Sequence, residues 1–541
     1  MMPRNRTLKQ ISFLLLALLL LLGSAGCSQP APRDTAAPVD ATYQEPHRPQ
    51  FHFSPPTMWM NDPNGMVFYE GEYHLFYQYY PADTVWGPMH WGHAVTEDLV
   101  HWKHLPIALY PDDLGYIFSG SAVVDWQNTS GFGVDGKPPL VAVFTYHNAE
   151  LAKTKRKNHE YQGIAWSNDR GRTWTKFSGN PVLPNTQKLQ DFRDPKVFWH
   201  RPTDRWVMAL SATDHVQFWG SGNLKEWRKL SEFGREWGAH GGVWECPDLV
   251  EMPVSGTTET RWVLLLNLNP GGPQGGSGTQ YFVGDFDGTT FTLEDRFKQT
   301  LEQKEAVWLD SGKDNYAGVT WADVPPADGR TLFIGWMGNW EYAQQVPTSP
   351  WRSAMTLPRE LILAKTGDNY RVLSRPVDEL KKLRQSTWQA QPEVLADGEA
   401  LPLPAPFPIS SSVVILEFEL PANGQQVVSV ELSNENGDVY RIGYDGFTNE
   451  FFSDRTTSGN SSFSEQFAAV HRSPRLTRDR QLRLHIFFDV ASAELFADGG
   501  ANVMTELFFP SRPFSQLSIR ADGQEIEMTR ATVYELDGIW N

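Results

Sequence analysis

Five stretches of the chain share the pattern of a buried strand, with apolar, β-branched or aromatic residues dominating each one. They are Tyr73 to Tyr79, Leu140 to Tyr146, Arg205 to Ser211, Trp262 to Leu268 and Thr331 to Met337. The stretches end roughly 60 to 70 positions apart, and most of the units then close with a turn and an aromatic residue. Strand–turn units repeated at this spacing predict an all-β fold that begins with a five-bladed β-propeller, with antiparallel strands around a central channel.

Each of these stretches follows a second strand-like run that opens with polar residues. In a propeller the innermost strands of all blades begin near one end of the axis, so we expect these polar openings to converge. Asp62, Asp194 and Glu245 occupy such openings on three different blades. Asp-Pro and Asn-Gly pairs are also ordinary turn residues, so one such cluster has a structural explanation. Three carboxylates at matching positions favour a shared site.

The pattern changes after about Arg375. A short helix or linker and a Pro-rich stretch come first, and short alternating strands separated by Asn-Gly and Asp-Gly turns follow, which predicts a β-sandwich. We therefore expect the propeller over residues 49–370, a linker over 371–408 and the sandwich over 409–541. The predicted sandwich strands are Val413 to Leu420, Gln426 to Leu432, Val439 to Tyr444, Leu482 to Val490, Leu507 to Phe509 and Leu517 to Arg520.

The N-terminus has the composition of an export signal over residues 1–27. Basic residues at positions 4, 6 and 9 precede an apolar run from Ile11 to Leu22, which is too short to span a membrane comfortably. Ala25-Gly26-Cys27 resembles the end of a bacterial lipobox, which would lipidate Cys27; ordinary cleavage near Ala25 is the alternative. Residues 28–48 are polar and Pro-rich, which predicts a flexible tether. Both alternatives predict export, to the cell envelope as a lipoprotein or to the periplasm or medium.

Composition excludes several classes of function. The net charge of −17 argues against a nucleic-acid partner, because phosphate neutralisation needs basic residues. The two cysteines give no disulfide framework and no cysteine-based zinc site. The pairs His90/His93 and His101/His104 have no third ligand nearby, so we predict neither a metal nor a cofactor. Contact with a membrane is expected only through the N-terminal lipid.

Two carboxylates flanking a glycosidic bond are the minimum for its hydrolysis. Asp62 lies beside Asn61 and Asn64, whose amides can donate hydrogen bonds and favour the ionised form that a nucleophile needs. Glu245 follows Trp244 in an apolar, donor-poor segment, where desolvation would raise its pKa and suit it to act as a general acid.

Asp194 follows Arg193, which would hold it ionised if the two side chains approach each other. An anion there would stabilise positive charge on a sugar ring. Aromatic side chains flank the polar openings and would pack against sugar rings, although filling gaps between blades is the alternative. These are Trp59, Trp86, Phe118, Trp244, Trp336 and Trp340.

Taken together, the motifs resemble glycoside hydrolase family 32, the β-fructofuranosidases that include invertases, inulinases and levanases. WMNDPNG at 59–65 matches the opening motif of the family, and FRDP at 192–195 and WECPDL at 244–249 match its other catalytic motifs. Further similar blocks occur in the expected order. They are YQYYP at 77–81, FSGSAV at 118–123, WMGNW at 336–340 and HIFFDVASAELFADGG at 485–500. The resemblance extends from about His52 to the end of the chain.

The resemblance implies a propeller plus sandwich and a retaining mechanism, with Asp62 as nucleophile, Glu245 as acid/base and Asp194 as transition-state stabiliser. One departure is Asn315, where relatives usually carry an aromatic residue. Family matches and flanking positions together give the candidate substrate-binding residues. They are Asn61, Asn64, Gln78, Trp86, Phe118, Ser119, Arg193, Trp336 and Trp340.

The segment WMGNWEYAQQVPTSPWR at 336–352 is similar to bacterial levanases and inulinases more than to plant invertases. We therefore expect release of terminal fructose from fructans, levan or inulin, with sucrose as a smaller substrate. The open alternatives are a fructosyltransferase on the same fold and a non-catalytic glycan-binding lipoprotein. An Asp-box pattern at 167–174 also occurs in sialidases, although the arginine cluster and activated tyrosine of that class are not evident.

Overall fold

The computed structural model of the protein describes residues 42–367, 369–404, 407–421 and 424–540. The predicted signal, Cys27 and most of the predicted tether lie outside the described residues. Within the described ranges, no helix combines the length and apolar character needed to cross a membrane.

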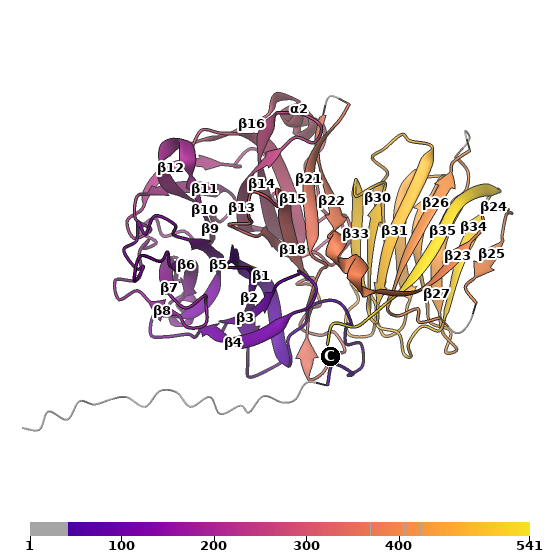
Figure 1. The fold of residues 1–541 in the computed structure, drawn as a ribbon, viewed down its shortest axis with the longest axis horizontal. Coiled ribbons are helices and arrows are strands. Elements are labelled where there is room, and N and C mark those ends of the chain that lie inside the picture. The colour runs from indigo at the N-terminus through magenta and orange to yellow at the C-terminus, as the bar shows by residue number, and fades with distance from the viewer. Residues whose placement is uncertain (1–41, 368, 405–406, 422–423, 541) are drawn as a thin grey trace, which may run out of the picture. The chain divides into compact units, whose positions relative to one another are not determined.

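About the first two-thirds of the described chain form five antiparallel sheets in chain order, which confirms the five-bladed propeller (Figure 1). Blade one contains β1 (Met58–Tyr69), β2 (Glu72–Tyr80), β3 (His90–Thr96) and β4 (Lys103–Leu109), and blade two contains β5 (Tyr116–Val124), β6 (Leu140–His147), β7 (Glu160–Ser167) and β8 (Thr175–Lys176). Blade three contains β9 (Phe192–His200), β10 (Arg205–Ala212), β11 (Val216–Ser221) and β12 (Arg228–Phe233), and blade four contains β13 (Val243–Pro253), β14 (Thr260–Asn269), β15 (Gly278–Phe286) and β16 (Phe291–Leu293). Blade five contains β17 (Tyr316–Thr320), β18 (Thr331–Met337), β21 (Arg359–Thr366) and β22 (Asn369–Pro376), with β20 (Ala354–Met355) paired to β18.

The five stretches identified from the sequence are the second strands of the blades, β2, β6, β10, β14 and β18. They were recognisable because they are sandwiched between neighbouring blades and buried on both faces, which selects continuous apolar runs. The helices α1 (Ala149–Lys153) and α2 (Asp295–Gln303) are short insertions between strands.

The ring closes between the first and last blades. Residues 351–352 form β19, which pairs in parallel with the start of β1, while the adjoining β20 pairs with blade five. At the other end of β1, Ala322 donates its N–H to Met66 O and accepts from Phe68 N, both at 2.9 Å. Backbone hydrogen bonds therefore join the two blades at both ends of β1.

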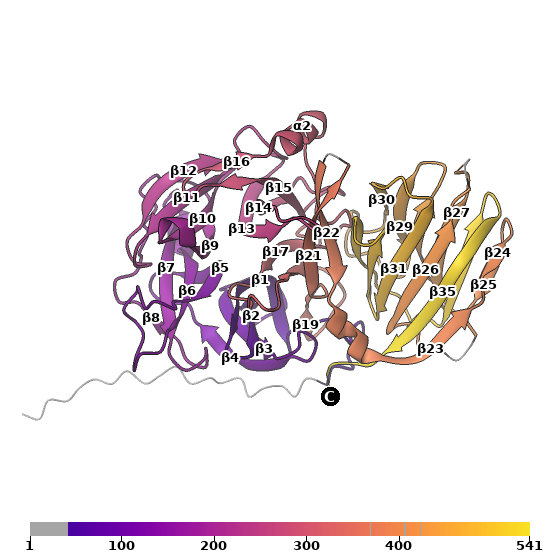
Figure 2. The same ribbon diagram turned by 45° about the horizontal axis from the view of Figure 1, so that its top comes forward.

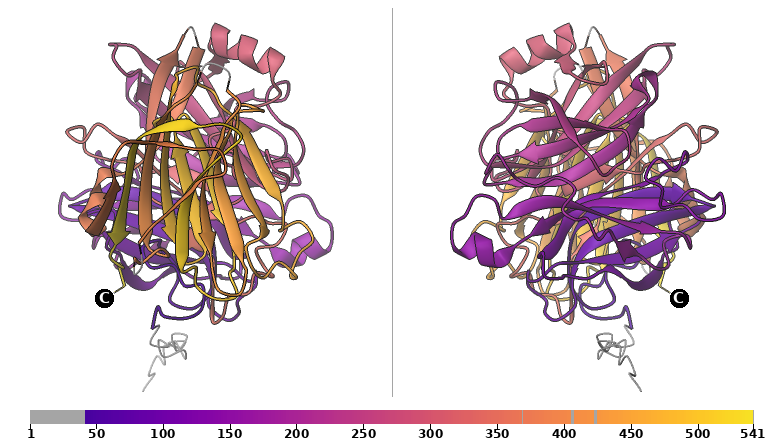
Figure 3. Two further views of the ribbon diagram at one scale, coloured as in Figure 1. Left: turned by 90° about the vertical axis from the view of Figure 1, so that its right-hand side faces the viewer. Right: turned by 90° about the vertical axis from the view of Figure 1, so that its left-hand side faces the viewer.

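A two-sheet β-sandwich follows, as predicted (Figure 3). One sheet contains β23 (Arg384–Ala390), β24 (Glu393–Leu395), β26 (Ser412–Glu419), β31 (Gln481–Asp489), β32 (Ser492–Ala497), β33 (Asn502–Leu507) and β35 (Ile526–Leu536). The other contains β25 (Ala400–Pro402), β27 (Val427–Ser433), β28 (Val439–Asp445), β29 (Glu450–Thr457), β30 (Val470–Pro474) and β34 (Gln516–Asp522). A cluster of buried residues from both sheets forms its core.

The segment 371–408, expected to be a linker, contains strands instead. β22 completes blade five, and β23, β24 and β25 extend the two sheets of the sandwich. Only the short 3₁₀ helix Asp378–Leu383 connects the two parts. Local sequence concealed the strands because the Pro-rich, polar composition is also tolerated by short edge strands, where one side of the backbone stays unpaired.

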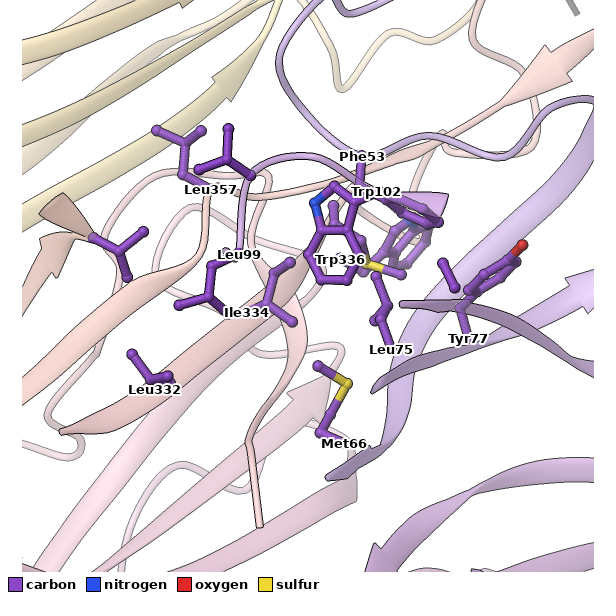
Figure 4. Close-up of a cluster of buried hydrophobic side chains, with 14 of the residues drawn as sticks. Phe53, Met66, Leu75, Tyr77, Leu99, Trp102, Leu332, Ile334, Trp336 and Leu357 are labelled. Atoms are coloured by element: carbon purple, nitrogen blue, oxygen red, sulfur yellow. The ribbon is translucent and has the colours of Figure 1, made fainter. Parts of the chain in front are cut away.

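A buried apolar cluster connects blades one and five and continues into the sandwich. Met66 and Leu75 meet Ile334 and Trp336 in this cluster (Figure 4), and Phe487 joins it from β31. Buried ion pairs cross the same interface: Arg359 of blade five contacts Glu494 of the sandwich, and Arg455 of the sandwich lies 2.7 Å from Asp314 of the propeller. The propeller and the sandwich therefore share one core, which fixes the frame that holds the site.

Candidate active site

The five innermost strands, β1, β5, β9, β13 and β17, all lose regular pairing near their beginnings. They surround the middle of the propeller in Figure 2. The interruptions lie at Asn61 and Asp62, Phe118 and Ser119, Asp194 and Pro195, Cys246 and Pro247, and Ala317 and Gly318. Asp194, Cys246 and Ala317 have positive φ values of 64°, 44° and 52°. Such bulges turn side chains out of the alternating pattern of a strand, and the strain is characteristic of functional sites.

Hydrogen bonds between blades bring the three predicted carboxylates to the same end of the channel. Ser119 Oγ of blade two donates to Asp62 Oδ2 of blade one at 3.4 Å. The Cys246 N–H of blade four donates to Asp194 Oδ2 of blade three at 3.0 Å, and Arg193 Nε of blade three donates to Glu245 Oε1 of blade four at 3.1 Å. Four blades thus meet at the carboxylates.

Asp62 receives a hydrogen bond from Asn61 Nδ2 at 2.9 Å, in line with the donors expected from the sequence. The expectation that such donors keep Asp62 ionised was nevertheless wrong, because the hydrogen bonds from Asn61 and Ser119 do not offset two larger influences on its pKa. Burial first, and then the nearby charge of Glu245, raise the pKa of Asp62 to about 6. Asp62 is therefore a carboxyl group that ionises near neutral pH.

Asp194 also differs from the expectation. Its Arg193 neighbour turns away toward other carboxylates, and the hydrogen bond that Asp194 accepts comes from the Cys246 backbone. Burial raises the pKa of Asp194, and the charge of Glu245 adds to the rise, although Arg193 opposes it. Ionised Asp194 is therefore disfavoured by its surroundings, and a positively charged sugar transition state would offset that cost.

Glu245 does not lie in the donor-poor surroundings that the sequence indicated. Arg193 donates to Oε1 through Nε, with a second guanidinium nitrogen 3.0 Å away, and the Tyr316 hydroxyl donates a short hydrogen bond to Oε2. Tyr316 is completely buried, and burial keeps its pKa well above the usual range, so it stays a phenol. Both oxygens of Glu245 are thereby held in fixed positions.

Arg193 is itself held by a network that sequence reasoning missed. Its Nη1 lies 2.6 Å from Asp191 and 3.0 Å from Glu160, a buried residue that also accepts from the Phe192 N–H at 2.8 Å. Burial opposes ionisation of Glu160, but Arg193 and His147 lower its pKa to about 2. Glu160 opens β7 far from any recognised motif, so no local signal marked it.

Three of the predicted sugar-facing aromatics cannot contact a ligand in this arrangement. Trp59, Trp244 and Trp336 are fully buried, so the alternative that they fill gaps in the core applies. Trp336 packs against both Trp59 and Trp340, with ring centroids 6.1 and 5.0 Å away. The expectation that Trp336 binds substrate is therefore wrong: it supports Trp340, which is partly exposed.

The other predicted aromatics form an accessible wall. Trp86 is 37% exposed and meets the edge of Phe118, whose other side stacks on His147 with a centroid separation of 4.3 Å. Two of the predicted substrate-binding amides are buried and paired: Gln78 Nε2 donates to Asn64 Oδ1 at 2.9 Å. The Nδ2 atom of Asn64 has no partner within the described ranges.

The two histidine pairs considered for a metal do not converge. His93 lies 3.0 Å from His74, His101 pairs with Asp98, and His104 with the Tyr43 hydroxyl. Among the described residues, one group of potential ligands lies together: His147, His159 and Glu160, with ligand atoms within 4.8 Å of one another. Arg193 already neutralises that carboxylate, so the group is better described as part of the Arg193 network.

Comparison with known proteins decides the classification. The model of the glycosyl hydrolases family 32 N-terminal domain matches residues 52–376, and that of the family 32 C-terminal domain matches residues 379–535. The chain belongs to glycosyl hydrolase family 32. It is accordingly a glycosidase, as the resemblance of its motifs predicted.

Relatives within family 32 match nearly all of this chain. A levanase from Bacillus subtilis (strain 168) is 46% identical over 511 residues, covering 92% of this chain and 72% of the relative. An extracellular exo-inulinase from Aspergillus awamori is 40% identical over 524 residues, covering 92% of this chain and 96% of the relative.

Solved family 32 structures share the fold. The A. awamori exo-inulinase crystal structure has a TM-score of 0.83 at 37% identity, covering 92% of this chain and all of the relative. A β-fructofuranosidase from Schwanniomyces occidentalis complexed with fructosyl-erythritol has a TM-score of 0.81 at 32% identity, covering 92% and 99% of the two chains.

Membership of family 32 excludes the sialidase alternative. The Asp-box segment has a structural role instead. Asp169 accepts hydrogen bonds from the N–H and hydroxyl of Thr173, closing the turn after β7. Arg170 and Arg172 then pair with Glu72 of blade one at 3.1 and 2.7 Å. The Asp-box turn therefore joins blade two to blade one through these ion pairs.

Proposed function

We propose that this chain is an exported, exo-acting and retaining fructan β-fructosidase that also hydrolyses sucrose. The observation that carries the proposal is the gathering of Asp62, Asp194 and Glu245 from three inner strands around one partly exposed site. The names of its levanase and exo-inulinase relatives support a fructan as the substrate.

In the first step, Asp62 attacks the anomeric carbon of the terminal fructosyl unit while Glu245 gives its proton to the departing oxygen. The carbon–oxygen bond of the glycosidic link breaks and an ester bond to Asp62 forms. Positive charge develops on the ring between these events, and the Asp194 carboxylate stabilises it.

In the second step, Glu245 takes a proton from water, and the resulting hydroxide attacks the same carbon. The ester bond breaks, fructose leaves and Asp62 is again free. Arg193 and Tyr316 keep the Glu245 carboxylate oriented through both steps. A retaining mechanism requires the Asp62 and Glu245 carboxyl groups to lie about 5–5.5 Å apart, which a crystal structure with bound fructose would measure.

Early anomeric composition tests the mechanism. We expect NMR spectra taken in the first turnovers to show β-fructofuranose, because two displacements restore the configuration. An initial excess of the inverted anomer would refute Asp62 as nucleophile. Asp62→Ala and Glu245→Ala should abolish nearly all turnover, whereas a non-catalytic glycan-binding protein would show no turnover to lose.

The products formed from different substrates test whether the enzyme is exo-acting and hydrolytic. Early digestion should release fructose alone from levan and inulin, and fructose and glucose in equal amounts from sucrose. Early oligosaccharides would indicate internal cutting, and products longer than the substrate would indicate fructosyl transfer. For the anchor, we propose lipidation of Cys27. Cys27→Ala should then move the enzyme from the membrane fraction to the soluble fraction, and an unchanged distribution would favour ordinary cleavage near Ala25.

A further inference from the structure

A second cavity lies at the other end of the inner strands, and the mechanism does not use it. Its volume is about 980 Å³, and its walls come from the closing residues of β5, β9 and β13 and from the segment after β17. This size lies in the range of small-molecule sites. We call it the far cavity. Along β9, Lys196 and Trp199 of the cavity wall lie two and five residues beyond Asp194, so the far cavity extends from about 7 Å to about 17 Å from that carboxylate.

A buried ion pair separates the far cavity from the catalytic carboxylates. Lys196 of blade three donates to Asp248 of blade four at 2.9 Å and to the Thr320 carbonyl of blade five at 2.8 Å. Lys196 and Thr320 border both the far cavity and the small cavity beside Asp194. The two ends of the channel are therefore distinct sites.

Trp126 stands at the mouth of the far cavity and is 62% exposed. Its Nε1 donates to Asp323 Oδ1 at 2.8 Å, while Oδ2 of the same carboxylate accepts from the Val124 N–H at 2.9 Å. The Tyr69 ring packs beside the indole, with centroids 6.0 Å apart. The polar edge is thus satisfied and the ring held in place, so it presents a preorganised apolar face to solvent, as an anchor for a ligand requires.

The walls offer further aromatic surface and unused donors. Trp199 and Trp262 are both half-buried, and in the described ranges neither indole N–H donates to a protein acceptor. Three carboxylates line the far cavity, Asp204, Glu251 and Asp323. Of two arginines that also line it, Arg330 pairs with Asp328 and Glu379, and Arg201 is exposed. Acidic groups disfavour an anionic ligand, whereas aromatic faces with free donors suit a neutral chain of hydroxyl groups.

We propose that the far cavity is a second, non-catalytic fructan-binding site that holds a remote part of the same polymer. This rests on the proposed function, because an exo-acting enzyme engages only one chain end at its carboxylates and gains affinity from a second contact with the polymer. Sucrose, which is too short to reach both ends of the channel, gains nothing from the far cavity.

The test compares Trp126→Ala with Phe447→Ala, a control that removes a similarly exposed ring (60%) from the sandwich. Trp126→Ala should raise KM for levan or inulin about three- to tenfold and leave kcat and KM for sucrose unchanged. Trp126→Phe should retain most of the polymer affinity. Phe447→Ala should match the wild type on all substrates.

Binding without turnover gives a second readout. In an Asp62→Asn background, retardation in gels containing levan or inulin should weaken on adding Trp126→Ala and not on adding Phe447→Ala. Equal behaviour of the two variants would overturn the second site while leaving the proposed function intact. Wild-type protein that neither binds nor cleaves fructan would overturn the proposed function itself, and Trp126-dependent retardation by unrelated neutral polysaccharides would overturn the assignment to fructan.

Discussion

The two ends of the propeller channel are built from the same five strands but differ in backbone regularity. At the beginnings of the strands, pairing is interrupted and φ values turn positive, and burial together with the nearby charge of Glu245 raises the pKa values of Asp62 and Asp194. From Lys196 to His200 of β9 the pairing with β10 is regular, and aromatic side chains line a cavity. Chemistry is thus concentrated where the backbone departs from the ideal strand, which fits the association of strain with function.

The largest effect should appear when a carboxylate near the start of β13 and another near its end are each replaced by an amide and the two variants are compared. Glu245→Gln should lower kcat/KM for sucrose at least about 10³-fold, because the amide cannot give or take the proton. Glu251→Gln, six residues along the same strand and exposed beside the far cavity, should change it less than about twofold. Steady-state kinetics on purified variants measures both. Similar losses at the two positions would contradict a division of roles along the strand.

Next in size is the ion pair that divides the channel. Lys196→Met should lower the free energy of unfolding by roughly 3 kcal/mol, because Asp248 remains fully buried with its charge no longer compensated. Urea denaturation followed by tryptophan fluorescence measures the change.

The double variant Lys196→Met/Asp248→Asn serves as the matched comparison. It removes the uncompensated charge and should recover most of the loss. No recovery would mean that Lys196 acts through packing and not through the ion pair.

A smaller loss of activity should follow when Arg193 loses its ion pair with Glu160. Glu160→Gln keeps the shape of the side chain but removes the charge that engages Nη1, so kcat/KM should fall about tenfold. Arg193 would then act on Glu245 with less competition, and the alkaline limb of the pH profile should move to lower pH. Glu160→Asp, which retains the charge, should restore the position of that limb. A uniform loss of activity at every pH would instead indicate a purely structural role.

Sequence patterns predicted the parts of the fold that depend on burial. The second strands of the blades stood out because two neighbouring blades cover them, and β26, β27, β28, β31 and β34 of the sandwich were found at nearly their observed limits. The remaining sandwich strands were missed, and Leu507 to Phe509 was placed just beyond the strand β33 that ends at Leu507. Edge strands such as β25 and β30 alternate weakly or are short, so turn composition obscures them.

The candidate site was predictable in its identities but not in its contacts. The matching positions of Asp62, Asp194 and Glu245 in the repeat were enough to predict that they share one site. Neighbours in sequence were a poor guide to electrostatics, because bulges turn adjacent side chains apart: Arg193 contacts Glu245 and not Asp194. Tyr316 reaches Glu245 from another blade, a contact that only folding creates.

The smallest predicted effect concerns the acid limb at the catalytic end. Because the pKa of Asp62 is raised to about 6, the nucleophile becomes protonated as pH falls through 6, and kcat/KM should decline below that value. Ser119→Ala removes a hydrogen bond to the ionised carboxylate, so the limb should move to higher pH by up to about one unit. Ser121→Ala, which removes a bond to the Pro195 carbonyl instead, should leave the limb in place. If Ser119→Ala left the limb in place, the contact between Ser119 and Asp62 would not set the ionisation of the nucleophile. An equal shift in both serine variants would likewise contradict a specific effect of that contact.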